Sequence, residues 1–79
     1  YVANNAQYDE RYLSLISKEI KRLRIAKGFS SYETFAIEKN LDRKQYWRVE
    51  NGQNITVKTL TKVLDGLEIS FADFFKDLD

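Results

Sequence analysis

The chain contains no cysteine and no histidine among its 79 residues. Without cysteine there is neither a disulfide framework nor a thiolate zinc site. Without histidine, the base of Ser-His-Asp and Cys-His catalysis is missing as well. The carboxylates are scattered and never take the spacing of a calcium-binding loop. We therefore expect no catalytic site, no metal site and no cofactor.

Long apolar runs are absent too, since no stretch approaches the roughly 20 residues that a membrane-spanning helix needs. The chain also lacks the basic, apolar and small-residue pattern of a secretory signal. Hydrophobic residues make up 43 % and charged residues 32 % of the chain, which is typical of a globular domain. These features predict a soluble domain with no membrane segment and a cytoplasmic location.

The net charge of +1 is small, but the charges are unevenly distributed. Residues 18–48 carry nine Lys and Arg against four Asp and Glu, whereas residues 49–79 carry three against six. A basic block beside an acidic one could orient the domain on a polyanion such as DNA. Solvated helix faces would give the same segregation, so charge alone leaves both interpretations open.

The first helix is predicted from apolar spacing. From Tyr8 to Lys27, apolar residues recur every three or four positions, which places them on one side of a helix. Gly28 follows a basic last turn and is expected to end this helix. Residues 1–8 look like a flexible leader, which leaves residues 9–79 as the folded domain.

Capping residues predict where the later helices begin, because a Ser, Thr or Asp side chain there accepts a hydrogen bond from a backbone N–H three residues on. This spacing occurs in Ser30 with Glu33, Asp42 with Gln45, and Ser70 with Asp73. Thr56 or a neighbouring residue is expected to cap a further helix, which Gly66 should end. Asn40 is expected to turn the chain between the second and third helices, because Asn tolerates a positive φ.

Helical spacing also predicts which residues face inward. The expected sets are Phe35, Ala36 and Ile37 in a helix running to about residue 39; Tyr46 and Val49 in a helix stopped by Asn51-Gly52; Val57, Leu60, Val63 and Leu64; and Phe71, Phe74, Phe75 and Leu78. No segment has the alternation that a strand requires. The prediction is an all-α domain of five helices.

Two short helices joined by about three residues, the second stopped by Asn-Gly, are typical of a helix-turn-helix. Four motifs extend this pattern: L-R-x-x-K-G at residues 23–28; a core of Ala36, Leu41, Tyr46 and Val49; E-x-G at residues 50–52; and apolar-S-apolar-x-D-F-F at residues 69–75. With these motifs, the chain from Ile20 to Phe75 resembles the lambda-repressor-like, Cro-type (XRE) helix-turn-helix family. The resemblance implies a compact five-helix fold and a sequence-specific transcriptional regulator, expected to be a repressor.

The third helix, residues 43–51, would enter the major groove of double-stranded DNA. Arg can bind guanine O6 and N7 with both arms of its guanidinium, and Lys can reach the same acceptors. The family's base-contacting places fall on this helix, and the predicted base contacts are Arg43, Lys44, Trp47 and Arg48, with Gln45 at the margin. An exposed Trp47 could instead anchor a partner or cover a neighbouring helix.

Phosphate contacts are expected where helix N-termini and turns offer N–H groups to anions. The predicted contacts are Ser30, Ser31 and Tyr32, the backbone and side chain around Asn51, and more weakly Gln53 and Lys58. The resemblance also implies a largely buried ion pair between Arg24 and Glu50.

The expected partner is double-stranded DNA, bound by a homodimer. The phenylalanines of the last helix are explained by packing in the core, by dimerisation, or by binding of a protein partner. The alternative function is therefore a protein-interaction module such as an antitoxin, with or without DNA binding. A DNA affinity that falls steeply with salt discriminates between the two functions.

Overall fold

The computed structural model describes residues 5–76 and 78, and all regular secondary structure in this part of the chain is helical. The elements are α1 (Asn5–Ala26), α2 (Tyr32–Glu38), α3 (Arg43–Glu50), α4 (Val57–Leu67) and α5 (Phe71–Lys76). This confirms the predicted all-α, five-helix fold. Residues 5–8, predicted to belong to a flexible leader, form the first turns of α1 instead, and residues 1–4 lie outside the described residues.

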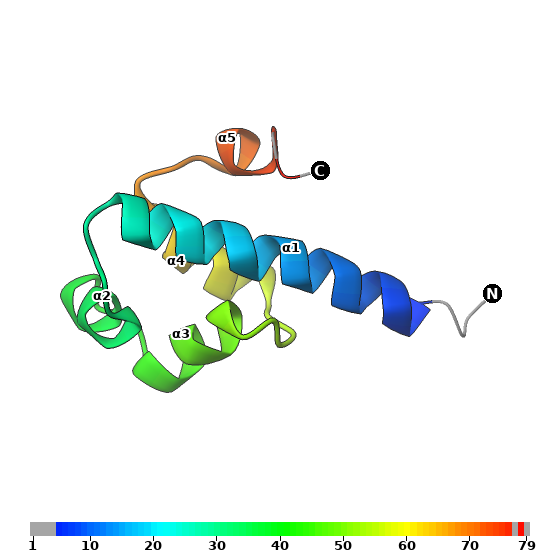
Figure 1. Ribbon diagram of the computed structural model, residues 1–79, viewed down its shortest axis with the longest axis horizontal. Coiled ribbons are helices and arrows are strands. Elements are labelled where there is room, and N and C mark those ends of the chain that lie inside the picture. Colours follow the sequence, from blue (N-terminus) through cyan, green and yellow to red (C-terminus); the bar gives the residue numbers. More distant parts are fainter. Residues whose placement is uncertain (1–4, 77, 79) are drawn as a thin grey trace.

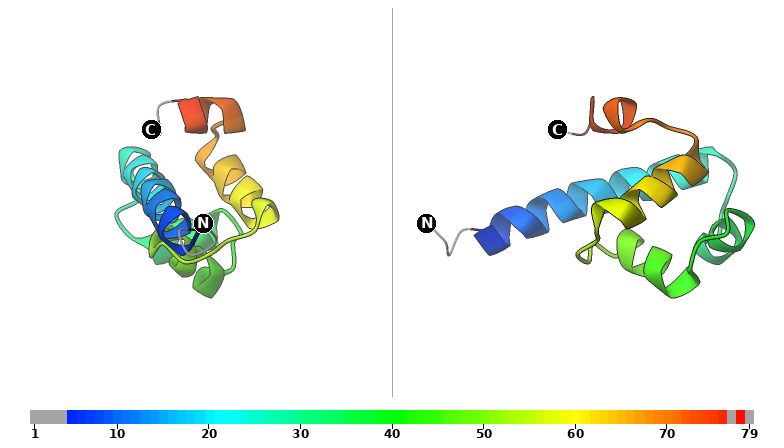
Figure 2. Two further views of the ribbon diagram at one scale, coloured as in Figure 1. Left: turned by 90° about the vertical axis from the view of Figure 1, so that its right-hand side faces the viewer. Right: turned by 180° about the vertical axis from the view of Figure 1, so that it is seen from behind.

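The long helix α1 crosses the whole domain (Figure 1). Helices α2 and α3 lie on one side of it and α5 lies on the other side (Figure 1), while α4 runs alongside it in the views of Figure 2. The first turns of α1 project beyond the other helices, and the domain is accordingly elongated, with extents of 42 × 26 × 21 Å. The two helices of the helix-turn-helix therefore form one edge of the domain.

The core draws on all five helices. On the side of the helix-turn-helix, Phe35 of α2 is completely buried. The Phe35 ring is 5.2 Å from the ring of Phe29 and 5.1 Å from the ring of Tyr46. Burying one large apolar side chain contributes about 1.5–3 kcal/mol, so these contacts hold α2 and α3 together. The fully or almost fully buried apolar residues are Ile20, Phe35, Ala36, Tyr46, Val49, Leu60, Val63, Leu64, Leu67 and Phe74.

Four residues predicted to face inward are exposed. Ile37 is 72 % exposed, because Phe35 and Ala36 already occupy the inner side of the short α2 and Ile37 points further around the helix. Val57 is 69 % exposed because it is the first residue of α4, next to the cap. In α5, Phe74 is buried, whereas the remaining two are 40 % exposed, namely Phe71 and Phe75.

The cap of α2 is Ser31 rather than the predicted Ser30. Its hydroxyl oxygen accepts hydrogen bonds from the backbone N–H groups of Glu33 at 3.2 Å and Thr34 at 3.3 Å. The helix thus begins one residue later than the capping-box spacing predicts. The other three predicted caps are confirmed by N–H donors at 2.8 to 3.1 Å, with the pairs Asp42 and Gln45, Thr56 and Thr59, and Ser70 and Asp73.

Positive φ angles occur at one predicted and one unpredicted non-glycine position. Asn40 has φ 58°, which confirms it as the turn between α2 and α3. Gly66 does not end α4, contrary to prediction: the helix continues to Leu67, and Glu68 takes the left-handed conformation with φ 60°. A Cβ at residue 66 would lie 3.2 Å from the Cβ of Lys39, so a side chain there would require Lys39, at the end of α2, to shift by a few tenths of an ångström.

An ion pair joins the end of α1 to the end of α3. Arg24 Nε donates to Glu50 Oε2 at 2.6 Å and Arg24 Nη2 donates to Glu50 Oε1 at 3.2 Å, with side chains only 5 % and 8 % exposed. Arg24 Nη1 also donates to the carbonyl of Phe29 at 2.7 Å, and the Tyr46 hydroxyl donates to Glu50 Oε2. This network fixes α3 against α1 and against the loop that leads to α2.

Replacing Glu50 by alanine should therefore be strongly destabilising. The substitution leaves the Arg24 guanidinium buried without its counter-charge, at a cost of about 3–5 kcal/mol. A domain of this length has a total stability of roughly 4–12 kcal/mol, so Glu50→Ala is expected to be close to unfolded. Urea unfolding followed by circular dichroism measures the loss, and a loss below about 1 kcal/mol would contradict the role given to this pair.

Arg22→Ala provides the matched control, because it breaks another Arg–Glu pair that is exposed to solvent. Arg22 binds Glu19 within α1 at 2.7 Å, and its side chain is 64 % exposed. Solvent screens such a pair, so the urea midpoint of Arg22→Ala should stay at the wild-type value.

Candidate nucleic-acid interface

Helix α3 separates an inner set of side chains from an outer set. Tyr46 and Val49 are 1 % and 2 % exposed, and with Glu50 they attach the helix to the domain. The side chain of Asp42 caps its first turn. The structure brings the four principal predicted base-contacting residues onto the outer face, where all are exposed: Arg43, Lys44, Trp47 and Arg48.

The outer face is cationic and only weakly neutralised. Arg43 Nη1 lies 3.3 Å from Glu33 Oε2 on α2, but both side chains are at least half exposed. Such pairs are worth little in water, so Arg43 can exchange this partner for another acceptor. Lys44 and Arg48 form no ion pair with any residue of the described part of the chain. Two cations are thus available on α3, and a third is loosely held.

Trp47 keeps 43 % of its surface accessible. Its backbone carbonyl accepts a hydrogen bond from Asn51 Nδ2 at 2.7 Å, which closes the end of α3. The partly open indole ring is able to touch an apolar group such as a thymine methyl. Gln45 is exposed as well, although its backbone N–H is used by the cap at Asp42.

The predicted phosphate contacts at the start of α2 are placed together. Ser30 is exposed and Ser31 is half-buried as the cap. Tyr32 is also half-buried and packs against the core. The Ser31 oxygen accepts two N–H groups, which leaves its hydroxyl hydrogen to donate to an acceptor outside the helix.

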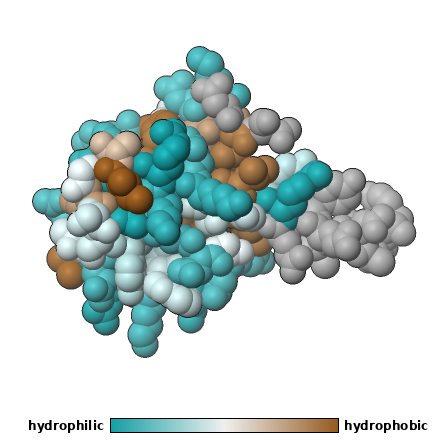
Figure 3. Space-filling model, viewed as in Figure 1, coloured by the Kyte–Doolittle hydropathy of each residue, from teal (hydrophilic) through white to brown (hydrophobic). Residues whose placement is uncertain are grey.

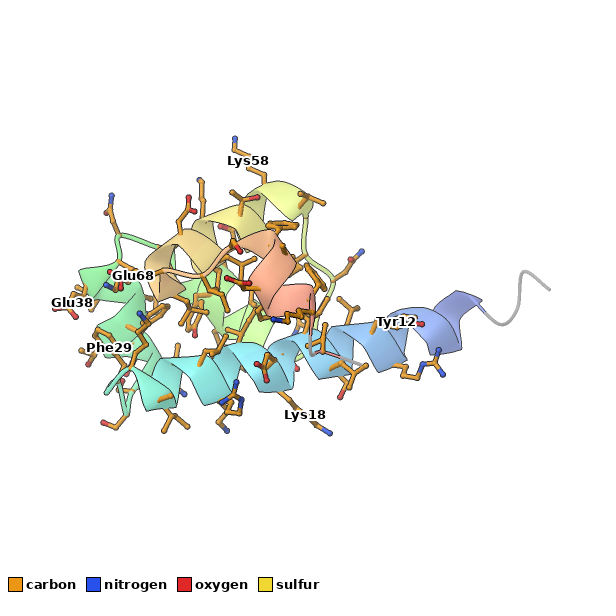
Figure 4. All side chains as sticks on the ribbon, turned by 90° about the horizontal axis from the view of Figure 1, so that it is seen from above. Tyr12, Lys18, Phe29, Glu38, Lys58 and Glu68 are labelled. Carbon is orange, nitrogen blue, oxygen red and sulfur yellow. The ribbon has the colours of Figure 1, made fainter. Side chains whose placement is uncertain are left out.

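The turn after α3 differs from the sequence-based expectation that its backbone amides meet phosphates. The N–H groups of Asn51, Gly52 and Gln53 all donate to carbonyls of α3 at 3.1 to 3.3 Å. Those amides are therefore used within the turn itself. The exposed side chain of Gln53 can reach out from it, whereas the Asn51 side chain already donates to the Trp47 carbonyl. Lys58, the remaining candidate, points away from α1 and from the body of the domain (Figure 4).

A cleft beside this turn was not predicted from the sequence. It has a volume of about 380 Å³ and lies between α1 and the turn, with Lys18 and Lys21 on one wall and Asn51 and Gly52 on the other. The signal in the sequence is two lysines three positions apart, with no acidic residue three or four positions from either of them. The sequence does not show that these two lysines lie close to the turn in the folded chain.

Hydrophilic and hydrophobic residues gather on different parts of the surface. In the view of Figure 3, hydrophilic side chains project from the lower part of the molecule, where α2 and α3 lie, whereas hydrophobic residues gather in its upper part toward α5.

Within residues 5–76 and 78, no group of three His, Cys, Asp or Glu residues could hold a metal ion. None of the described helices is both long and apolar enough to cross a membrane.

Comparison with known proteins gives related controller proteins. No family model matches the chain. The control protein C.MunI of Mycoplasma sp is 37 % identical over 62 residues, which cover 77 % of this chain and 84 % of that protein. The wild-type restriction-modification controller protein C.Esp1396I is 40 % identical, with a TM-score of 0.73 over 85 % of this chain and 87 % of that structure. The chain belongs to the restriction-modification controller proteins.

Other structures of the same relative contain DNA. C.Esp1396I bound to a 25 base-pair operator site has a TM-score of 0.72 to this chain at 40 % identity, covering 85 % of this chain and 88 % of that one. Its tetramer in complex with a natural 35 base-pair operator has a TM-score of 0.74 at 38 % identity, with the same two coverages. C.Esp1396I is thus a controller protein that binds operator DNA.

In this controller protein burial and the hydrogen bond to Glu50 also shift the pKa of Tyr46. Burial raises the pKa of the Tyr46 hydroxyl far above its usual range, and the hydrogen bond to the Glu50 carboxylate raises it further. The hydrogen bond to Glu50 likewise raises the pKa of Arg24. Tyr46 therefore stays neutral and keeps donating to Glu50 whenever α3 is in place.

This shift predicts a loss of stability at alkaline pH. In the unfolded chain Tyr46 has its ordinary pKa of about 10, so above that pH the unfolded chain gives up a proton that the folded chain retains. The stabilisation is complete below about pH 10 and declines as pH rises further, by up to about 1.4 kcal/mol per pH unit. Urea unfolding of wild type and Tyr46→Phe at a series of pH values measures it.

The Tyr46→Phe chain should lose stability less steeply over this range, whatever its stability at neutral pH. Tyr12→Phe, which removes the hydroxyl from a tyrosine that is 46 % exposed, is the control for the loss of a tyrosine hydroxyl as such. Equal slopes for wild type and Tyr46→Phe would show that Tyr46 is not protected from ionisation.

Proposed function

We propose that the chain is a sequence-specific, double-stranded-DNA-binding transcriptional regulator of the lambda-repressor-like, Cro-type family, and that it controls genes of a restriction-modification system. The observation that carries this proposal is the outer face of α3, which presents Arg43, Lys44 and Arg48 on a helix whose inner face is locked by Glu50. The operator-bound structures of C.Esp1396I support it. In this role the chain catalyses no reaction and needs no cofactor, and it acts in the cytoplasm with the DNA that it regulates.

The proposed contacts follow from the chemistry of each group. Arg43 and Arg48 can each bind a guanine with two hydrogen bonds in the major groove, and Lys44 reaches the same acceptors or a phosphate. Gln45 and Trp47 extend the base-reading face at its margin and over thymine methyl groups. The phosphate contacts are assigned to the start of α2, with Ser30, Ser31 and Tyr32, and to the exposed side chains of Asn51, Gln53 and Lys58.

A homodimer on DNA is the second part of the proposal. Phe71 and Phe75 of α5 are each 40 % exposed, and their rings lie 5.6 Å apart. Helix α5 lies on the opposite side of α1 from α2 and α3 (Figure 1), so contact between two copies through α5 leaves both α3 helices open to DNA. The same two rings favour the alternative function, in which α5 binds a different protein, as an antitoxin does.

In vitro selection of bound DNA sequences is the experiment that tests the function. We expect one preferred operator with two inverted half-sites about 10 to 10.5 base pairs apart, because operator symmetry mirrors dimer symmetry. Recovery of random DNA would contradict sequence-specific binding and favour the interaction module.

Substitutions of base-contacting residues on α3 should alter sequence specificity. Substitution of a phosphate-contacting residue should not. On the selected operator, Arg43→Ala and Arg48→Ala are each expected to cost about 1–3 kcal/mol and to flatten the preference at one or two base positions. Lys58→Ala should weaken binding to all sequences by a similar factor and make the slope of log K against log salt shallower by about 1. Competition among single-base operator variants at two salt concentrations gives both quantities.

The ranking of operator variants is the deciding readout. If Arg43→Ala and Arg48→Ala fold and bind but keep the wild-type ranking, α3 does not read the bases.

The two exposed phenylalanines of α5, Phe71 and Phe75, should matter more for dimerisation than for folding. Phe71→Ser and Phe75→Ser are expected to shift the domain towards monomer in analytical ultracentrifugation, because each removes exposed apolar surface from the contact. Wild type should bind DNA with two half-sites more tightly than DNA with one, and the variants should lose most of this difference. A dimer that persists in both variants would place the contact elsewhere.

A further inference from the structure

The cleft between α1 and the turn after α3 gathers polar groups from two distant parts of the chain. Ser14, Ser17, Lys18 and Lys21 line it from α1, and Glu50, Asn51 and Gly52 line it from the end of α3 and the turn. The turn approaches α1 closely, since a Cβ on Gly52 would lie 3.8 Å from Ser17 Oγ. The cleft is therefore bounded by packed structure on both sides.

The cleft carries unbalanced positive charge. Lys18 and Lys21 are exposed, and neither forms an ion pair with any residue that the structure describes. Glu50 is the one acid among the lining residues, and its charge is already paired with Arg24. Like charges three positions apart on a helix repel each other, so the free domain holds the two lysines together at a cost.

An anion in this cleft would have to be bound by side chains. The amides of the turn all donate within the turn and offer no N–H group. Ser17 donates its hydroxyl to the carbonyl of Ser14 at 3.0 Å and is likewise occupied. Figure 4 shows Lys18 on the side of α1 away from α4, so its ammonium group is accessible from solvent.

We propose that this cleft binds a phosphate of the DNA backbone, with Lys18 and Lys21 as its cationic ligands. The cleft adjoins the C-terminal end of α3, so the phosphate would flank the bases that α3 reads. Binding of the phosphate relieves the repulsion between the two lysines and releases counterions from DNA. The inference rests on the proposed function, to which it adds α1 as a DNA-contacting helix.

Salt titrations of Lys18→Gln and Lys21→Gln test the proposal. Each contact with a phosphate contributes about 0.9 to the slope of log K against log salt on duplex DNA. Each variant should therefore show a slope shallower by about 0.9 and bind about 3- to 10-fold more weakly near 0.1 M salt. The loss should be the same on the selected operator and on an unrelated duplex, with the ranking of operator variants unchanged.

Lys62→Gln is the matched control, because it removes one positive charge from an exposed residue of α4, outside the cleft and outside the proposed dimer contact. We expect it to keep the wild-type slope. Thermal midpoints should show no loss of stability in Lys18→Gln or Lys21→Gln, since each substitution removes a like-charge repulsion within α1.

Operators with single uncharged methylphosphonate linkages locate the phosphate. At one position in each half-site, replacing the charged phosphate by a methylphosphonate should weaken the binding of the wild-type protein to the operator. The same replacement should not weaken the binding of the double variant Lys18→Gln/Lys21→Gln. If wild type prefers its operator but both single variants keep its salt slope, the inference is wrong and the proposed function stands. If wild type itself shows neither sequence preference nor salt dependence, the proposed function falls and the inference falls with it.

Discussion

The guanidinium of Arg24 turns inward from the end of α1 and meets the carboxylate of Glu50 from the last turn of α3. Both side chains are almost excluded from water, so each charge depends on the other, because an unpaired buried charge costs several kcal/mol. The same guanidinium holds the carbonyl of Phe29 in the loop before α2. One cation thus sets the relative positions of α1, the loop and α3. The direction of the outer face of α3 follows from this arrangement, as does the width of the cleft beside it.

Local chemistry explains which features of the fold could be predicted. The caps at Asp42 and Thr56 depend on residues three positions away, and the turn at Asn40 depends on the backbone preference of a single residue. The errors have more than one cause. Gly66 lies close against Lys39 and does not end its helix, and Ile37 lies on a helix too short to bury every apolar residue. A sequence pattern does not distinguish these cases.

One part of the candidate site could be predicted from the sequence and another part could not. The family resemblance pointed to Arg43, Lys44 and Arg48, and helical spacing is consistent with one shared face, because residues three and four positions apart are neighbours on a helix. The cleft was not predictable, since Lys18 and Lys21 approach the turn only in the folded chain. Nor does the sequence show which amides the turn consumes. The small net charge of +1 hides this local concentration, because acidic residues near the C-terminal end compensate for it.

The separation of inner and outer residues on α3 has a consequence for divergence. Tyr46, Val49 and Glu50 hold the helix in place, whereas Arg43 and Arg48 contribute nothing to the core. Mutations on the outer face can therefore accumulate without a penalty in folding, and under the proposed function each one would change which DNA sequence fits. Two descendants of one ancestral chain could keep the same architecture and come to ignore each other's operators. Separate regulatory circuits could then coexist in one cell without cross-talk.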